Sequence, residues 1–243
     1  MKRFNMPGLL ALAILSLAPA AVAQTADEIL AANVVAIGGA DAAKDLKSYI
    51  FHGSMTMMYG MTVKMVSYVK GDKMFARQTV ESMGLEMVMG CDGTDCYAND
   101  QMMGLRLLEG QDKDQMVTSN DFTAALDWKD LYKTREYKGE VEENGRPAHN
   151  VYLETEQGMK MHNLYDKETN MLVKSTFTVK SPMGEITGEM WFDEYKDIHN
   201  GFKVPVKMHT KTMGMAGTVE FTEIEVNVEI PDSKFDLPAD LKK

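Results

Sequence analysis

The chain has 243 residues, and its 36 acidic side chains outnumber its 26 lysines and arginines to give a formal net charge of −10. This balance argues against binding to nucleic acid and against lasting adhesion to anionic membranes. Methionine is abundant, with 22 residues, whereas there are only two cysteines.

The N-terminal segment MKRFNMPGLLALAILSLAPAAVA has the three parts of a secretory signal peptide. Lys2 and Arg3 supply the basic start, residues 9–17 form an apolar stretch too short to span a bilayer, and Ala21-Val22-Ala23 is a cleavage motif. We therefore predict a cleaved signal peptide over residues 1–23. The remaining residues 24–243 have the length of one domain, which we expect outside the cytoplasm.

Two helices are predicted after the signal peptide. Thr25 and Glu28 have the spacing of a capping box, and apolar residues then recur at helical spacing up to Ile37. The Gly38-Gly39 pair ends this helix, and a short second helix is expected over residues 40–46.

From Ser48 onward the apolar period changes to two, which is typical of strands. The stretch 54–68 holds five methionines in fifteen residues. A three-residue loop over residues 58–60 ends on glycine and sets Met57 opposite Met61 and Met55 opposite Val63, whereas a two-residue loop would mix the two faces. The sequence therefore predicts one continuous methionine-rich face across two strands.

The two cysteines bracket the turn sequence Asp-Gly-Thr-Asp between two further predicted strands. Residues that face each other across a hairpin lie at a separation suitable for a disulfide, and an exported chain meets oxidising conditions. A redox pair or a thiolate metal site is disfavoured because no C-x-x-C motif or His-rich partner accompanies the pair. We predict a structural disulfide between Cys91 and Cys96.

The alternation lapses over residues 101–133, where we expect an irregular segment with one or two short helices, and it resumes near Tyr137. Short turns between about ten or eleven strands indicate an antiparallel meander, and a sheet of this length must curl. The predicted helices are too small to fill such a curve. The expected fold is mainly β with a few helices, in which a single antiparallel curved sheet forms an unclosed half β-barrel with a helical lid.

The methionine-rich face has three possible roles: soft core packing, a Cu(I) site, or a pliable cavity for apolar ligands. Core packing is the plainest of these, but a well-specified core is built mainly from Leu, Ile and Val. Cu(I) binding is kept as the alternative, although in extended strands His162 and His209 point away from the adjacent Met161 and Met208. The five histidines are scattered and no catalytic motif is present, so we predict neither an enzyme nor a metal or other cofactor.

Four stretches resemble the outer membrane lipoprotein-sorting proteins, which are LolA-like periplasmic carriers. They are ADEILAANVVAIGGADAAKDLKSYIFHGSM, GCDGTDCYAND, WFDEYKDIHNGFKVPVKM and VEFTEIEVNVEIPDSKFDLP. The resemblance implies an unclosed antiparallel barrel with lid helices over an apolar cavity. It also implies a periplasmic shuttle, without cofactor, that moves acylated lipoproteins or lipids from an inner-membrane release complex to an outer-membrane acceptor.

The cysteine pair and the methionine content depart from the general family pattern. Arg77 and Arg106 are candidates for the arginine that ties the lid to the barrel in some carriers. We expect a monomeric carrier whose acyl-binding residues contribute apolar contact only, the last three of them from the lid. These residues are Phe51, Met55, Met57, Met61, Val63, Met65, Leu85, Met87, Met89, Met103, Leu105 and Leu108.

Overall fold

The computed structural model describes residues 24–242 except 58–59, 111, 114–115, 118–120, 157 and 182–183. The predicted signal peptide lies outside the described residues. The helix α1 (Ala26–Ala36) begins with the predicted capping box, in which Thr25 and Glu28 bond reciprocally. The second helix, α2 (Gly39–Ala43), follows Gly38, whose φ is +110° and whose Cβ, if present, would lie 2.4 Å from the carbonyl oxygen of Gly201. Only glycine fits this close approach between helix and sheet.

The described residues form one sheet of thirteen antiparallel strands. The strands are β1 (Ser48–Met57), β2 (Thr62–Lys70), β3 (Lys73–Val80), β4 (Leu85–Cys91), β5 (Cys96–Asp100), β6 (Gly104–Leu108), β7 (Tyr132–Glu143), β8 (Arg146–Thr155), β9 (Lys160–Asp166), β10 (Leu172–Ser181), β11 (Gly184–His199), β12 (Phe202–Thr212) and β13 (Met215–Val226).

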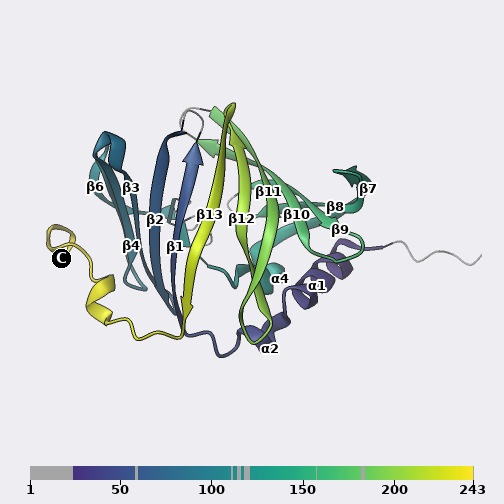
Figure 1. Cartoon of the computed structure of the whole chain (residues 1–243), viewed down its shortest axis with the longest axis horizontal. Coiled ribbons are helices and arrows are strands. Elements are labelled where there is room, and N and C mark those ends of the chain that lie inside the picture. The colour runs from purple at the N-terminus through teal and green to yellow at the C-terminus, as the bar shows by residue number, and fades with distance from the viewer. Residues whose placement is uncertain are drawn as a thin grey trace, which may run out of the picture.

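The order of strands in the sheet is β6-β5-β4-β3-β2-β1-β13-β12-β11-β10-β9-β8-β7, so the first strand pairs with the last. The strands β6 and β7 are the two edges and do not pair with each other, which leaves the barrel unclosed (Figure 1). The short helices are η2 (Glu81–Met83), η3 (Ala124–Asp127), α4 (Trp128–Leu131), η4 (Asp232–Phe235) and η5 (Ala239–Leu241). The expected half-barrel is therefore confirmed.

The segment expected to be irregular, residues 101–133, contains one more strand than predicted. The sequence GLRLL of β6 does not alternate, because this short edge strand has apolar residues on both faces. Leu105 and Leu108 belong to β6, so their assignment to the lid is wrong. The short helices expected within this segment are present as η3 and α4.

The helices cover only part of the inner face of the sheet, and three buried clusters mark where they pack. Ile29 and Leu30 of α1 contact Val151 and Leu153 of β8. The turn that follows α1 packs on the beginning of β12, and α2 packs there as well. Phe122 packs on β1. Figure 1 shows α1 and α2 at the end of the molecule away from the β1–β2 and β12–β13 hairpin tips. The cover therefore ends part of the way along the strands.

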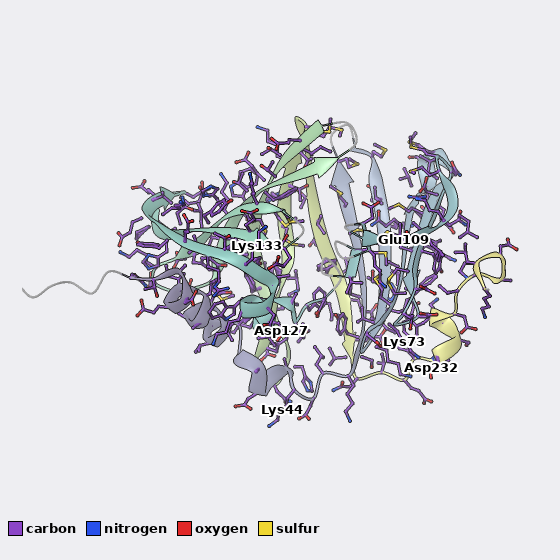
Figure 2. The ribbon with its side chains drawn as sticks, turned by 180° about the vertical axis from the view of Figure 1, so that it is seen from behind. Lys44, Lys73, Glu109, Asp127, Lys133 and Asp232 are labelled. Carbon is purple, nitrogen blue, oxygen red and sulfur yellow. A yellow bond between two sulfur atoms is a disulfide. The ribbon has the colours of Figure 1, made fainter. Side chains whose placement is uncertain are left out.

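The C-terminal segment after β13 packs on the opposite, outer face of β2 and β3. The ammonium of Lys234 lies 4.2 Å from the ring centroids of both Tyr68 and Phe75, and Phe235 is 2% exposed. Lys70 donates a hydrogen bond to Asp232 at 2.9 Å, and Lys73 lies 3.5 Å from the same carboxylate (Figure 2). This segment closes the outer face of these strands and leaves the inner face to the helices.

None of the helices within the described ranges has the length and apolar character needed to cross a bilayer.

Candidate apolar binding face

Two rows of mainly apolar residues cross the inner face near the hairpin tips. In one row Val219 of β13 pairs with Met55 of β1, which pairs with Val63 of β2. The register places Met55 opposite Val63 as predicted from the loop length, and the backbone N–H of Met57 bonds the carbonyl of Met61 at 2.8 Å.

A second row crosses six strands from β13 to β5. Its members, each paired with the next, are Phe221, Gly53, Met65, Gln78, Met87 and Asp100. Side chains on one face of a sheet at such adjacent positions lie within contact distance. The two rows make a surface that is apolar except for Gln78 and Asp100.

This surface is only partly covered by the protein, and we call it the open half of the inner face. Seven of the predicted residues belong to it and are all partly exposed, in contrast to the buried residues lower on the same strands. They are Met55, Met57, Met61, Val63, Met65, Leu85 and Met87.

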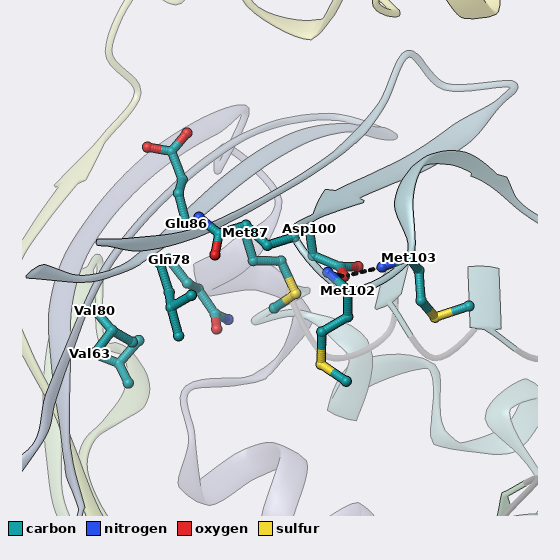
Figure 3. A pocket seen from close by; sticks show the side chains of 10 residues that line it. Val63, Gln78, Val80, Glu86, Met87, Asp100, Met102 and Met103 are labelled. Atoms are coloured by element: carbon teal, nitrogen blue, oxygen red, sulfur yellow. Dashed lines mark hydrogen bonds between the residues drawn. The ribbon is translucent and has the colours of Figure 1, made fainter. Parts of the chain in front are cut away.

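A pocket of about 440 Å³ lies at the β2–β5 side of the open half (Figure 3). Four predicted residues contribute to its wall: Val63, Leu85, Met87 and Met103. In Figure 3 the side chain of Met87 points into the same space as that of Met102, while Glu86 points to the other side of the strand. The pocket is thus lined mainly by unbranched thioethers and by valine and leucine, which suit an apolar guest of variable shape.

Asp100, one of two charged residues at the pocket, is held by partners within or next to its own turn. Its carboxylate accepts hydrogen bonds at 2.9 Å from the backbone N–H groups of Met102 and Met103, and Arg106 donates to it at 2.6 Å. The Met103 N–H and then the Arg106 guanidinium hold the pKa of Asp100 below its usual range. The charge of Asp100 is therefore neutralised locally and shapes the turn that carries the two methionines.

Three predicted residues lie instead in or against the covered core. Phe51 is 6% exposed, with its ring centroid 5.0 Å from that of Phe122 and 4.9 Å from that of Phe221. Met89 and Leu108 pack against the same cluster. These side chains therefore lie in the covered part of the inner face, next to the open half.

Leu105 is on the wrong face for the role predicted for it. It pairs with Asn99, which pairs with Val88, whereas the inner face at β4 carries Met87 and Met89. Because successive residues of a strand point to opposite faces, Leu105 points outward. The pattern GLRLL gave no indication of which leucine faces inward.

Several residues of the pocket wall are not among those predicted from the sequence. Gln78 and Val80 follow Met74 and Ala76 at a spacing of two, so the parity of β3 could have identified them. The others, Glu86, Asp100, Gln101 and Met102, lie at or beside hairpin connections whose approach depends on the tertiary structure.

The geometry does not support the copper alternative. Nε2 of His209 lies 2.7 Å from the carboxylate of Asp193 and Nδ1 lies 2.9 Å from the hydroxyl of Thr218, while its neighbour Met208 is buried on the opposite face. His162 contacts the side chain of Asn150. Among the residues that the structure describes, no three His, Cys, Asp or Glu side chains gather as a metal site.

The predicted disulfide is present. Cys91 and Cys96 are paired residues of β4 and β5, their Cα atoms are 4.1 Å apart, and both are buried. The bond closes the hairpin next to the cluster around Phe51. It therefore stiffens the covered part of the sheet.

No protein-family model matches the sequence, and no curated protein matches it in sequence. Solved structures match it in fold. A DUF1329 family protein from Desulfovibrio piger has a TM-score of 0.59 at 11% identity, over 87% of this chain and 97% of that chain.

Two further matches have a TM-score of 0.57 at 12% identity. They are a domain assigned to the outer membrane lipoprotein-sorting proteins, from Vibrio parahaemolyticus, and a LolA superfamily protein from Nitrosomonas europaea. They cover 87% and 88% of this chain, and 97% and 99% of their own chains, respectively. The resemblance drawn from sequence is confirmed at the level of the fold.

Proposed function

We propose that this protein is a periplasmic carrier that binds the acyl chain of a lipid or lipoprotein on the open half of its inner face. One observation carries the proposal: Met55, Val63 and Met65 form an apolar surface shared by β1 and β2, Met87 lies beyond Gln78 in the row of Met65, and all four methionine and valine side chains remain partly exposed. Exposed contiguous apolar surface of this kind commonly marks a binding site. A guest chain would complete the packing that the helices leave unfinished.

The size and chemistry of the pocket support this proposal. Its volume of about 440 Å³ falls within the range of about 300–1,000 Å³ typical of small-molecule sites. Each methylene buried there contributes about 0.8 kcal/mol, so a long acyl chain supplies strong attraction without any specific polar contact. Methionine side chains adapt to different guests, which favours both uptake and release.

We extend the proposal to the partners of the carrier and to its lack of catalytic activity. The carrier acts as a monomer and not as an enzyme, and it receives its cargo from an inner-membrane release complex and passes it to an outer-membrane acceptor. The outer membrane lipoprotein-sorting domain among the matched structures favours a lipoprotein cargo. Residues 1–23 act in this scheme as a cleaved export signal.

Paired aspartate substitutions on the two faces test the binding site. Met55→Asp with Val63→Asp places two charges on the inner face, whereas Thr56→Asp with Thr62→Asp places the same two charges on the adjacent, exposed cross-strand pair. We expect the inner pair to reduce uptake of a fluorescent fatty acid at least about tenfold, because burying a charge beside an acyl chain is costly. The outer pair serves as the matched control. Equal uptake by both variants, each verified as folded by circular dichroism, would refute the proposed site.

The cargo itself is accessible to native mass spectrometry. Protein expressed with residues 1–23 and purified from a periplasm should carry a co-purified species with the mass of a lipid or of an acylated peptide. The Met55→Asp, Val63→Asp variant should lack this species.

A further inference from the structure

Most of the large apolar side chains that the described residues expose are methionines at hairpin connections. Met83 is 60% exposed after β3, and Met102 and Met103 are 95% and 69% exposed between β5 and β6. Met213 is 65% exposed in the β12–β13 turn, and Met215, the first residue of β13, is 53% exposed. We call these five residues the methionine rim. Turns usually carry Gly, Pro, Asn, Asp or Ser, so methionine at three of them is unexpected.

The connections of the rim lie along one edge of the half-barrel. Gln101 of the β5–β6 turn donates a hydrogen bond of 3.0 Å to the carbonyl of Gly84, which directly follows η2. The β12–β13 hairpin adjoins the end of β1, because Gly217 pairs with Met57. Figure 1 shows these tips together at the end of the sheet opposite α2.

Met213 occupies a turn position where methionine is unfavourable for the fold. It has φ +52° and is followed by Gly214 at φ +79°, in a two-residue turn between the paired residues Thr212 and Met215. Such turns strongly favour Asn-Gly, which the chain uses at Asn144-Gly145. Of the five described non-glycine residues with positive φ, four are asparagine and the fifth is Met213. The turn geometry therefore does not account for the choice of methionine.

We propose that the methionine rim inserts into the interfacial region of a lipid bilayer with little net surface charge. The five side chains project from three hairpin connections along a curved edge, an arrangement that a fluid surface can accommodate more readily than the fixed pockets of a protein partner. The rim also borders the pocket, since Met102 and Met103 belong to both. An acyl chain could thus pass between the bilayer and the inner face without crossing water.

The charges beside the rim favour an uncharged or zwitterionic bilayer. Lys64 pairs with Glu81 at 2.7 Å, and Arg106 pairs with Asp100 at 2.6 Å, so these two cations are neutralised within the chain. The formal net charge of −10 further opposes attraction to anionic lipid. The contact would depend on apolar insertion, which suits a reversible encounter.

Flotation of the mature chain with phosphatidylcholine vesicles tests the proposal. The rim variant combines Met102→Ser, Met103→Ser, Met213→Asn and Met215→Ser. The control variant combines Val35→Ser with Val141→Ser, which removes exposed apolar side chains on α1 and β7, away from the rim. We expect the rim variant to lower the partition coefficient about tenfold or more and the control to leave it unchanged. Absence of vesicle binding by the parent chain, or an equal loss in both variants, would overturn the proposal.

The single substitution Met213→Asn separates a membrane role from a structural one. It should maintain or raise the midpoint of thermal unfolding, because asparagine suits the turn, while it weakens vesicle binding. A lowered midpoint together with unchanged vesicle binding would assign Met213 to the fold and contradict the proposal. A parent dimer that the rim variant converts to monomer, with vesicle binding unaffected, would assign the rim to self-association instead.

This inference does not depend on the proposed function, because vesicle binding is measured without any ligand. If the carrier proposal fails, the Met55→Asp, Val63→Asp variant and its outer-face control will take up the fluorescent fatty acid equally. If the rim proposal fails, the rim variant will bind vesicles like the parent chain. The two results are independent.

Discussion

The backbone N–H of Phe122 donates a hydrogen bond to the hydroxyl of Tyr49 at 3.2 Å, and the two rings stack with their centroids 5.0 Å apart. This contact joins the segment before η3 to the first strand of the sheet, 73 residues earlier. Phe122 also packs on Phe51 and Phe221. It marks the limit of the cover, since Met55, four residues beyond Phe51, is already partly exposed.

Replacing Tyr49 by phenylalanine should loosen this attachment. The ring packing would remain, but the N–H of Phe122 would lose its acceptor, at a cost of about 1 kcal/mol in the free energy of unfolding. Urea denaturation and hydrogen exchange at the Phe122 amide measure the two effects. The control is Tyr152→Phe, because the Tyr152 hydroxyl bonds Glu154 on the outer face. Unchanged exchange at Phe122 would show that stacking alone holds the segment.

Gly188 of β11 leaves room for the ring of Phe177, its cross-strand partner on β10. A Cβ at Gly188 would lie 2.3 Å from Cζ of Phe177 and 2.7 Å from Oγ1 of Thr212. We expect Gly188→Ala to lower the free energy of unfolding by about 1–3 kcal/mol through overpacking. Adding Phe177→Leu should recover part of this loss in a double-mutant cycle. Additive losses in the cycle would contradict the steric explanation.

Removal of the disulfide should destabilise the chain moderately. Cys91 and Cys96 are only five positions apart, so the closed loop is short and its entropic contribution is about 2 kcal/mol. The paired substitutions Cys91→Ala and Cys96→Ala should shift the denaturation midpoint accordingly, and reductant should shift only the parent protein. A parent protein that is insensitive to reductant and a variant of equal stability would contradict this estimate.

His149 should make the stability depend on pH near neutrality. It is 4% exposed, and burial, reinforced by the charge of Lys167, lowers its pKa below the usual 6.5, with Glu140 opposing the shift. The folded state therefore disfavours protonation. The stability linked to neutral His149 is therefore fully present above about pH 6.5. It is lost as the pH falls from there through the folded-state pKa of His149.

The free energy of unfolding of the parent should thus decrease between pH 7.5 and pH 5.5 (both about one pH unit from the usual pKa of a histidine). The variant His149→Asn retains a polar partner for the hydroxyl of Tyr137, which lies 3.3 Å from Nδ1 of His149, and should show a shallower decrease. Parallel pH profiles for the two proteins would exclude His149 as the source.

The pairing of Met55 with Val63 was predictable from the loop length, because register depends on the parity of a short connection, which neighbouring residues determine. The capping box at Thr25 and the Cys91–Cys96 hairpin were also predictable, because each depends on residues that are close in the sequence. Leu105 was misassigned because a five-residue edge strand with three leucines lacks the alternation that identifies its inward face.

The sequence by itself determined the local features of this protein: its helix start, the period of its strands, its disulfide hairpin and the methionine face shared by β1 and β2. Only the tertiary structure decided that β1 pairs with β13, where Ser48 bonds Val228 across 180 residues, and how far Phe122 and the helices extend over the inner face. These features depend on contacts between distant segments, whose closeness no local pattern encodes. Which methionines are packed and which remain open to a guest follows from that distant packing.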